Sequence, residues 1–170
     1  MPEQYIVVDR LKLGYEGLFK ASELYNLIVF WFRERGYEWF EGMNQEEVTP
    51  QGRQIKIIMQ PGRKASDYYR LSIRVRLHML DVKEVEVEDK GQTLNVNHGV
   101  VRIIIDGYLL TDRKGKWATK PFLWFLSIIF DQYLFRPHFS KFETWVQNDV
   151  DDLHHKIKEY LNVSKYTFKQ

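Results

Sequence analysis

Five acidic and histidine side chains lie close together near the C-terminal end of the sequence, in a pattern that metal sites use. Asp149, Asp151 and Asp152 are followed by His154 and His155. On a helix, Asp151 and His155 stand four residues apart and share one face, which is a spacing that pairs of metal ligands adopt. A third ligand is not evident in the sequence. We therefore predict a solvated helix face with favourable charge pairs, and neither a metal centre nor another cofactor.

Basic side chains alternate along one predicted strand, "YYRLSIRVRLHML". Its period of two places them together on one face: Arg70, Arg74, Arg76 and His78. The next stretch, "KEVEVED", presents a matching acidic row: Glu84, Glu86 and Glu88. If the two stretches are neighbouring strands, arginine faces glutamate across the ladder and the sheet face is stabilised. A salt ladder is the first expectation, and a phosphate-binding surface is the alternative.

One carboxylate stands inside an apolar strand. Asp106 in "IIIDGYL" could have a raised pKa if it were buried without a partner. Alternation with Arg102 places it on the polar face, so we expect a cross-strand partner or a bulge at Gly107. The chain has no cysteine, which excludes thiol nucleophiles and disulfides. Two basic loops are candidate phosphate or RNA contacts, and their residues are Arg63, Lys64, Arg113, Lys114 and Lys116.

The composition is that of one globular domain. The chain has 170 residues, is 44 % hydrophobic and 28 % charged, and carries a net charge of +2. This balance does not by itself argue for nucleic acid. We predict a single α+β domain over residues 1–163 and a frayed tail over 164–170. No basic n-region precedes a long apolar stretch, so no signal peptide is expected and the predicted location is cytoplasmic.

The hydrophobic period predicts the order of the elements. A first strand over residues 4–19 is followed by a helix with Ser22 as its N-cap and Gly36 as its C-terminal stop. From residue 37 to 112 the period is two, with turns at Pro50–Gly52 and Asp89–Gly91. A final helix carries an apolar stripe: Phe142, Trp145, Val146, Val150, Leu153, Ile157, Tyr160 and Leu161.

This order resembles the helix-grip fold of the START, polyketide-cyclase and pollen-allergen superfamily (SRPBCC). The patterns "DRLKLGYEGLF" and "IIIDGYLLTDRKGKW" are similar to those of small uncharacterised archaeal proteins. The resemblance implies an antiparallel sheet of about five to seven strands wrapped on a long C-terminal helix, with one additional helix after the first strand. It also implies a cavity between sheet and helix, for which Trp31, Phe125, Phe142 and Trp145 are candidate lining. Another α+β topology stays open.

The most apolar stretch is "PFLWFLSIIFDQYLF", residues 121–135, in which eleven of fifteen side chains are Phe, Leu, Ile, Trp or Tyr. Its only charge is Asp131. A membrane-spanning helix needs about 20 apolar residues, so we expect no transmembrane span. Contact with a membrane surface is a minor alternative, because an interfacial helix keeps a strongly polar face and this one has almost none.

A helix that is apolar on all sides is either buried or meets something beyond its own domain. We therefore predict a non-catalytic binding or assembly protein, homodimeric or docked on a larger complex such as a ribosome. The predicted interface residues are Phe122, Trp124, Phe125, Ile128, Phe130 and Phe135. The alternative is a carrier of a small apolar ligand, or a cyclase-like enzyme, with Trp31, Phe142 and Trp145 lining its cavity.

Overall fold

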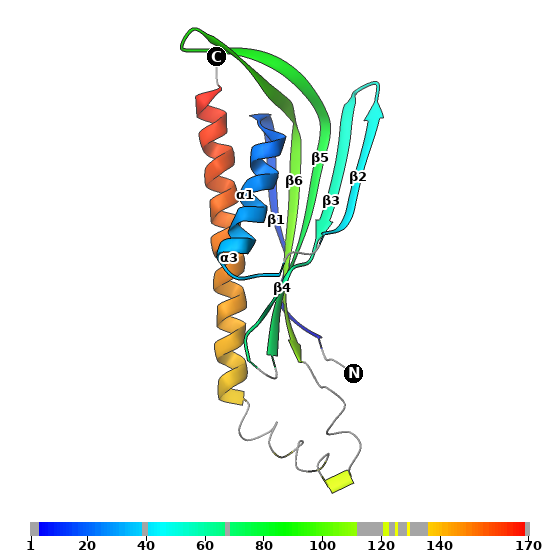
Figure 1. The fold of residues 1–170 in the computed structure, drawn as a ribbon, viewed down its shortest axis with the longest axis vertical. Coiled ribbons are helices and arrows are strands. Elements are labelled where there is room, and N and C mark those ends of the chain that lie inside the picture. Colours follow the sequence, from blue (N-terminus) through cyan, green and yellow to red (C-terminus); the bar gives the residue numbers. More distant parts are fainter. Residues whose placement is uncertain are drawn as a thin grey trace.

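The computed structural model describes residues 4–38, 41–66, 69–111 and 136–168, together with Pro121, Phe122, Phe125 and Ile129. Strand β1 (Gln4–Phe19) comes first and is followed by helix α1 (Ala21–Glu34). Five strands come next: β2 (Glu41–Thr49), β3 (Gly52–Met59), β4 (Gly62–Lys64), β5 (Tyr69–Asp89) and β6 (Gln92–Thr111). The long helix α3 (Arg136–Thr167) comes last (Figure 1). This order confirms the predicted α+β class with one early helix and a long C-terminal one.

The strands form one open antiparallel sheet in the order β1-β6-β5-β3-β2. The short β4 pairs with β5 beyond the point where β3 ends. β1 pairs with the last strand, so that Phe19 stands opposite Asn97 and Gln4 opposite Leu110. Six strands lie within the predicted range of five to seven, and the sheet is antiparallel as predicted.

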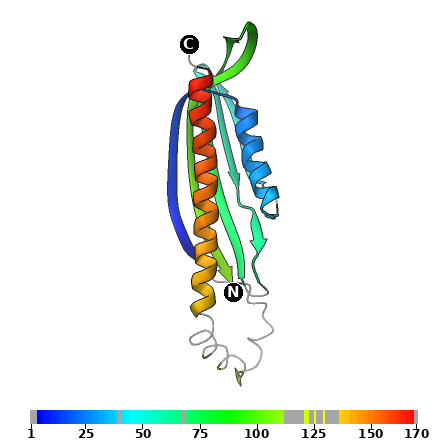
Figure 2. The same ribbon diagram turned by 90° about the vertical axis from the view of Figure 1, so that its left-hand side faces the viewer.

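The two long helices lie on the same face of the sheet and contact each other (Figures 1 and 2). The apolar stripe of α3 provides much of the core, because its members are fully or almost fully buried: Val146, Val150, Leu153, Ile157 and Leu161. Burial of each such side chain stabilises the fold by about 1.5–3 kcal/mol. Trp145 was expected in this stripe, but it is 38 % exposed and lies at its border.

The start of α1 differs from the expectation. Ser22 lies inside the helix, and the N-cap position belongs to Lys20, whose side chain makes no capping bond. Instead, the Oδ1 atom of Asn97 on β6 accepts a hydrogen bond of 3.0 Å from the N–H of Ala21. A free N–H at a helix start needs an acceptor, and here a neighbouring strand supplies it. The helix end agrees with the expectation, since Gly36 has a φ of +76°.

β5 is one strand of 21 residues, not two strands side by side. Asp81, with a φ of +53°, lies within a register shift between Leu80 and Lys83, where the strand bulges and continues. Lys90 and Gly91 then form a two-residue turn into β6, and both have positive φ. This is the conformation that tight hairpins favour. The predicted turn at Asp89–Gly91 is therefore confirmed.

The predicted frayed tail is wrong over most of its length. α3 continues to Thr167, and the Phe168 side chain is buried against Val87 and Val96 near the tip of the β5–β6 hairpin. Ser164 is also buried. The hairpin tip and the end of α3 therefore form a small second apolar cluster, which ties the C-terminal helix to the sheet.

Candidate functional site

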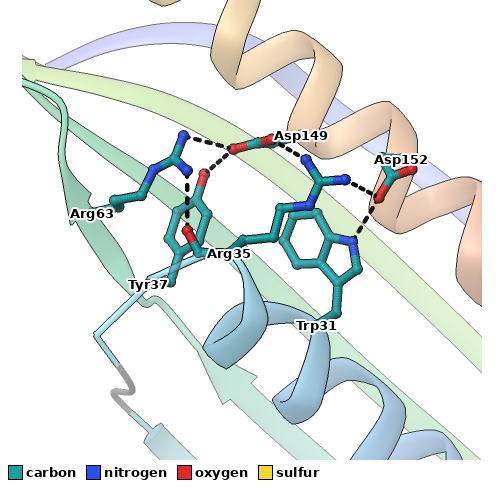
Figure 3. A network of polar contacts seen from close by, with 6 residues as sticks. All are labelled: Trp31, Arg35, Tyr37, Arg63, Asp149 and Asp152. Atoms are coloured by element: carbon teal, nitrogen blue, oxygen red, sulfur yellow. Dashed lines mark hydrogen bonds and ion pairs between the residues drawn. The ribbon is translucent and has the colours of Figure 1, made fainter.

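A buried carboxylate on α3 collects donors from two other segments of the chain (Figure 3). Asp149 is 5 % exposed. It accepts hydrogen bonds from Arg35 Nη1 at 2.9 Å, from the Tyr37 hydroxyl at 2.7 Å and from Arg63 Nη2 at 3.3 Å. Arg35 and Tyr37 follow α1, while Arg63 lies on β4. Three donors therefore converge on one buried acid.

One turn further along α3, Asp152 completes the network. Its Oδ2 atom accepts a hydrogen bond from Trp31 Nε1 at 2.7 Å and another from Arg35 Nη2 at 2.7 Å (Figure 3). Arg35 thus bridges the two carboxylates with the two ends of its guanidinium group, which is a strong charge-assisted geometry. We call Trp31, Arg35, Tyr37, Arg63, Asp149 and Asp152 the clamp.

Stacking and helix capping reinforce the clamp. The guanidinium of Arg35 lies 5.1 Å from the Trp31 ring centre, and that of Arg63 lies 5.2 Å from the Tyr37 ring centre. Arg63 Nη1 also donates to the carbonyl oxygen of Arg35 at 3.0 Å. That carbonyl stands at the C-terminal end of α1, where a cation is favourable. The clamp therefore holds α1, β4 and α3 together.

The environment of the clamp strongly shifts the pKa of its tyrosine. Burial, together with the adjacent Asp149 carboxylate, raises the pKa of Tyr37 far above its usual value. The Tyr37 hydroxyl therefore stays protonated and donates to Asp149. Two carboxylates face two guanidinium groups, so charge is balanced. The clamp connects parts of the fold, because both oxygens of Asp149 and the Oδ2 atom of Asp152 accept from protein donors.

The predicted solvated acidic turn is wrong for two of its members, since Asp149 is buried and Asp152 is half-buried in the clamp. Asp151 and His155, the pair at ligand spacing, are exposed. Among the described residues, no group of three or more His, Asp or Glu side chains is close enough to hold a metal ion. Burial of Asp149 had a signal in the sequence, because it falls on the apolar stripe between Val146 and Leu153.

A second buried acid lies on the other side of the sheet. Asp106 is 2 % exposed and forms ion pairs with Arg74 at 3.1 Å and Arg76 at 2.8 Å, both on β5. Its Oδ1 atom accepts the backbone N–H of Arg10 at 2.9 Å, where β1 bulges between Val8 and Leu11. The predicted cross-strand partner is confirmed, because Arg74 stands directly opposite Asp106.

The predicted salt ladder is wrong. Glu84, Glu86 and Glu88 lie further along the same strand as Arg74 and Arg76, so they cannot face them across a ladder. The strand opposite offers Asp106, Ile104 and Arg102 to Arg74, Arg76 and His78. Of the three glutamates, Glu84 has a basic partner, Arg53 on β3, at 3.3 Å.

The structure describes two of the five residues in the predicted basic loops, Arg63 and Lys64. Arg63 is part of the clamp and donates a hydrogen bond to Asp149. Lys64 lies at the end of β4, opposite Arg70. Arg113, Lys114 and Lys116 lie outside the described residues.

Two of the predicted apolar docking residues, Phe122 and Phe125, are exposed, and so is Ile129, which was not among those predicted. Phe122 is 71 %, Phe125 58 % and Ile129 41 % exposed, and all three have helical backbone. Positions three and four residues apart share a face wherever the chain is helical. Trp124, Ile128, Phe130 and Phe135 lie outside the described residues. In the part of the chain that the structure describes, no helix is long and apolar enough to cross a membrane.

The candidate cavity residues contact other protein groups. Trp31 packs edge-on against Phe32, at 5.2 Å between ring centres, and gives its N–H to the clamp. Phe142 lies 5.1 Å from the ring of Tyr69 and 5.2 Å from that of Trp145. The ammonium group of Lys141 lies over the exposed Trp145 ring. These aromatic rings therefore pack on one another and on charged side chains.

No protein family matches this chain, and neither a curated protein nor a solved structure does. The helix-grip resemblance accordingly rests on element order and stays a prediction. What the structure adds is the clamp, the buried Asp106 cluster and the exposure of Phe122, Phe125 and Ile129.

Proposed function

We propose that the protein is a non-catalytic binding or assembly protein that docks through the apolar helix face of residues 121–135. The observation that carries this proposal is the exposure of three large apolar side chains at helical spacing in this segment. Phe122, Phe125 and Ile129 are each exposed to solvent. Such surfaces on folded proteins mark interaction sites.

A second copy of the chain is the partner that this surface fits best. Across residues 121–135 the sequence has one charged side chain, Asp131. The surface therefore carries almost no charge pattern that would select an unlike partner. A two-fold axis brings the same apolar patch of two copies together, which is the simplest closed assembly. Aromatic anchors then desolvate at the centre of the interface.

The test is light scattering after size exclusion, combined with native mass spectrometry. We expect the wild-type protein to be a dimer and Phe122→Glu with Phe125→Glu to be a folded monomer. The matched control is Phe30→Glu on α1, because Phe30 is 67 % exposed and lies outside this segment. The control should stay dimeric.

Two results would contradict the proposal. A wild-type protein that stays monomeric at high concentration has no self-docking surface, and an unfolded double variant would mean that the two phenylalanines belong to the core. A monomer that carries a small apolar adduct would favour the carrier alternative. A monomer without an adduct would redirect the search to a larger complex.

A further inference from the structure

The sheet face turned away from α1 and α3, here called the outer face, carries basic side chains in register across neighbouring strands. In one cross-strand row, Lys12 on β1 and Arg76 on β5 both stand opposite Ile104 on β6, one on each side of it. In the next row, Arg102 on β6, His78 on β5 and Lys56 on β3 stand side by side. The alternate residues of these strands fill the core, so the basic groups face away from both helices.

Only part of this charge is neutralised. Asp106 forms ion pairs with Arg74 and Arg76. Three further cations on the outer face are exposed and form no ion pair within the described parts of the chain: Lys12, Lys56 and Arg102. The glutamates that were expected to oppose the row stand elsewhere on β5, so the centre of the face is positive.

The nearby acids lie toward the rim. Glu16, on the edge strand β1, stands one row beyond the row of Arg102. Glu47, on the edge strand β2, stands opposite Gln54 of β3. Two nitrogen atoms at the centre, Arg76 Nε and His78 Nε2, are buried and have no partner among the described residues. Burial and the adjacent Lys56, Arg76 and Arg102 lower the pKa of His78. Lys56 and Arg102 stand directly opposite His78 on the two flanking strands, so cations surround it on the sheet.

The size and composition of the outer face suit the phosphate backbone of a nucleic acid as its ligand. Strands stand about 4.8 Å apart, so the row from β1 to β3 extends over roughly 15 Å, which is enough for several phosphates of a duplex. None of the described residues in the two rows is Phe, Tyr or Trp, and the imidazole ring of His78 is half-buried. Tyr108, on the same face, is buried beneath the guanidinium of Arg74. Single-stranded nucleic acid is held by stacking on exposed rings, and these rows offer no exposed Phe, Tyr or Trp ring.

We propose that the outer face binds the phosphate backbone of double-stranded nucleic acid, without reading its base sequence, through Lys12, Lys56 and Arg102. This surface is separate from the apolar docking face. The two inferences can therefore fail independently.

The test uses fluorescence anisotropy with a labelled 24-base-pair DNA duplex of mixed sequence. Three phosphate contacts predict a slope of about −3 for log K against log salt. Replacement of one contact, as in Lys12→Gln, should reduce that slope by about 1 on every sequence. The triple variant Lys12→Glu, Lys56→Glu, Arg102→Glu should lose at least about tenfold in affinity at low salt.

The matched control changes the same number of charges on exposed positions of α3: Lys156→Glu, Lys158→Glu and Lys165→Glu. It should retain nearly all of the affinity, and circular dichroism should report folded protein for both triple variants. Equal losses in the two triple variants, or no binding at about 50 mM salt, would overturn the proposal. So would stronger binding of a single strand of equal length, or displacement of the duplex by polyglutamate of equal total charge. The last result would assign the face to an acidic protein partner.

Discussion

Arg35 Nη1 lies 2.9 Å from an oxygen of Asp149, and this single contact joins residues 114 positions apart in the sequence. It connects the end of α1 to the middle of α3. The same guanidinium reaches Asp152, and Arg63 approaches Asp149 from β4. Because both helices depend on one carboxylate, the clamp determines how the helical layer sits on the sheet.

Replacement of Asp149 by asparagine should therefore destabilise the protein. The change removes the charge that neutralises Arg35 and Arg63. Breaking a buried ion pair by removal of one partner typically costs about 3–5 kcal/mol, and the partial exposure of both arginines reduces the expected loss to about 2–3 kcal/mol. Urea unfolding followed by circular dichroism measures this free energy.

Asp151→Asn is the matched control, because Asp151 is exposed on the same helix. It should change the free energy of unfolding by less than about 0.5 kcal/mol. Similar values for the two variants would mean that the clamp contributes little to stability.

The remote cap of α1 gives a second prediction. Asn97→Ala removes the acceptor of the Ala21 N–H and should lower the free energy of unfolding by about 1 kcal/mol. Ser22→Ala removes the side chain that the sequence pattern favours as a cap. It should change stability by only a few tenths of a kcal/mol, because Ser22 lies inside the helix. A larger loss for Ser22→Ala than for Asn97→Ala would contradict this assignment.

The pH dependence of stability provides a third prediction. The folded protein holds the pKa of His78 below its model-peptide value of 6.5. As pH falls through 6.5, the unfolded chain takes up a proton at His78 before the folded protein does, so the free energy of unfolding decreases. Above that pH His78 is neutral in both states and this contribution is constant.

His78→Gln should make the free energy of unfolding less sensitive to pH between about 7 and 5. The measurement is a series of urea titrations across that range. His155→Gln, at an exposed position of α3, should leave the original pH dependence in place. An unchanged pH profile in the His78 variant would contradict the prediction.

Features with a local periodic signal were predictable from the sequence. The period of two along β5 and the apolar stripe of α3 appear in the structure at the expected residues. The hairpin turn was also predictable, because Lys90–Gly91 supplies the positive φ that a two-residue turn requires. Each of these signals depends on neighbours within a few positions of the chain.

The clamp was not predictable in the same way. The burial of Asp149 could be read from its position on the stripe, but its donors come from segments 86 to 114 residues away. The bulge at Asp81 had a similarly weak signal, since the residue is not glycine although its φ is positive. The two stretches that were expected to be neighbouring strands are therefore one long strand, β5. The glutamates lie further along this strand than Arg74 and Arg76 and do not stand opposite them.

The pairing of β1 with β6 has a consequence for how the chain is made. Gln4 stands opposite Leu110 and Phe19 opposite Asn97, so the first strand has no partner until residues 97–110 have been synthesised. At about 5–20 residues per second, the ribosome needs roughly 5–20 s to supply that partner. During this interval the nascent first strand lacks its partner, and an unpaired strand is prone to pairing with the wrong chain.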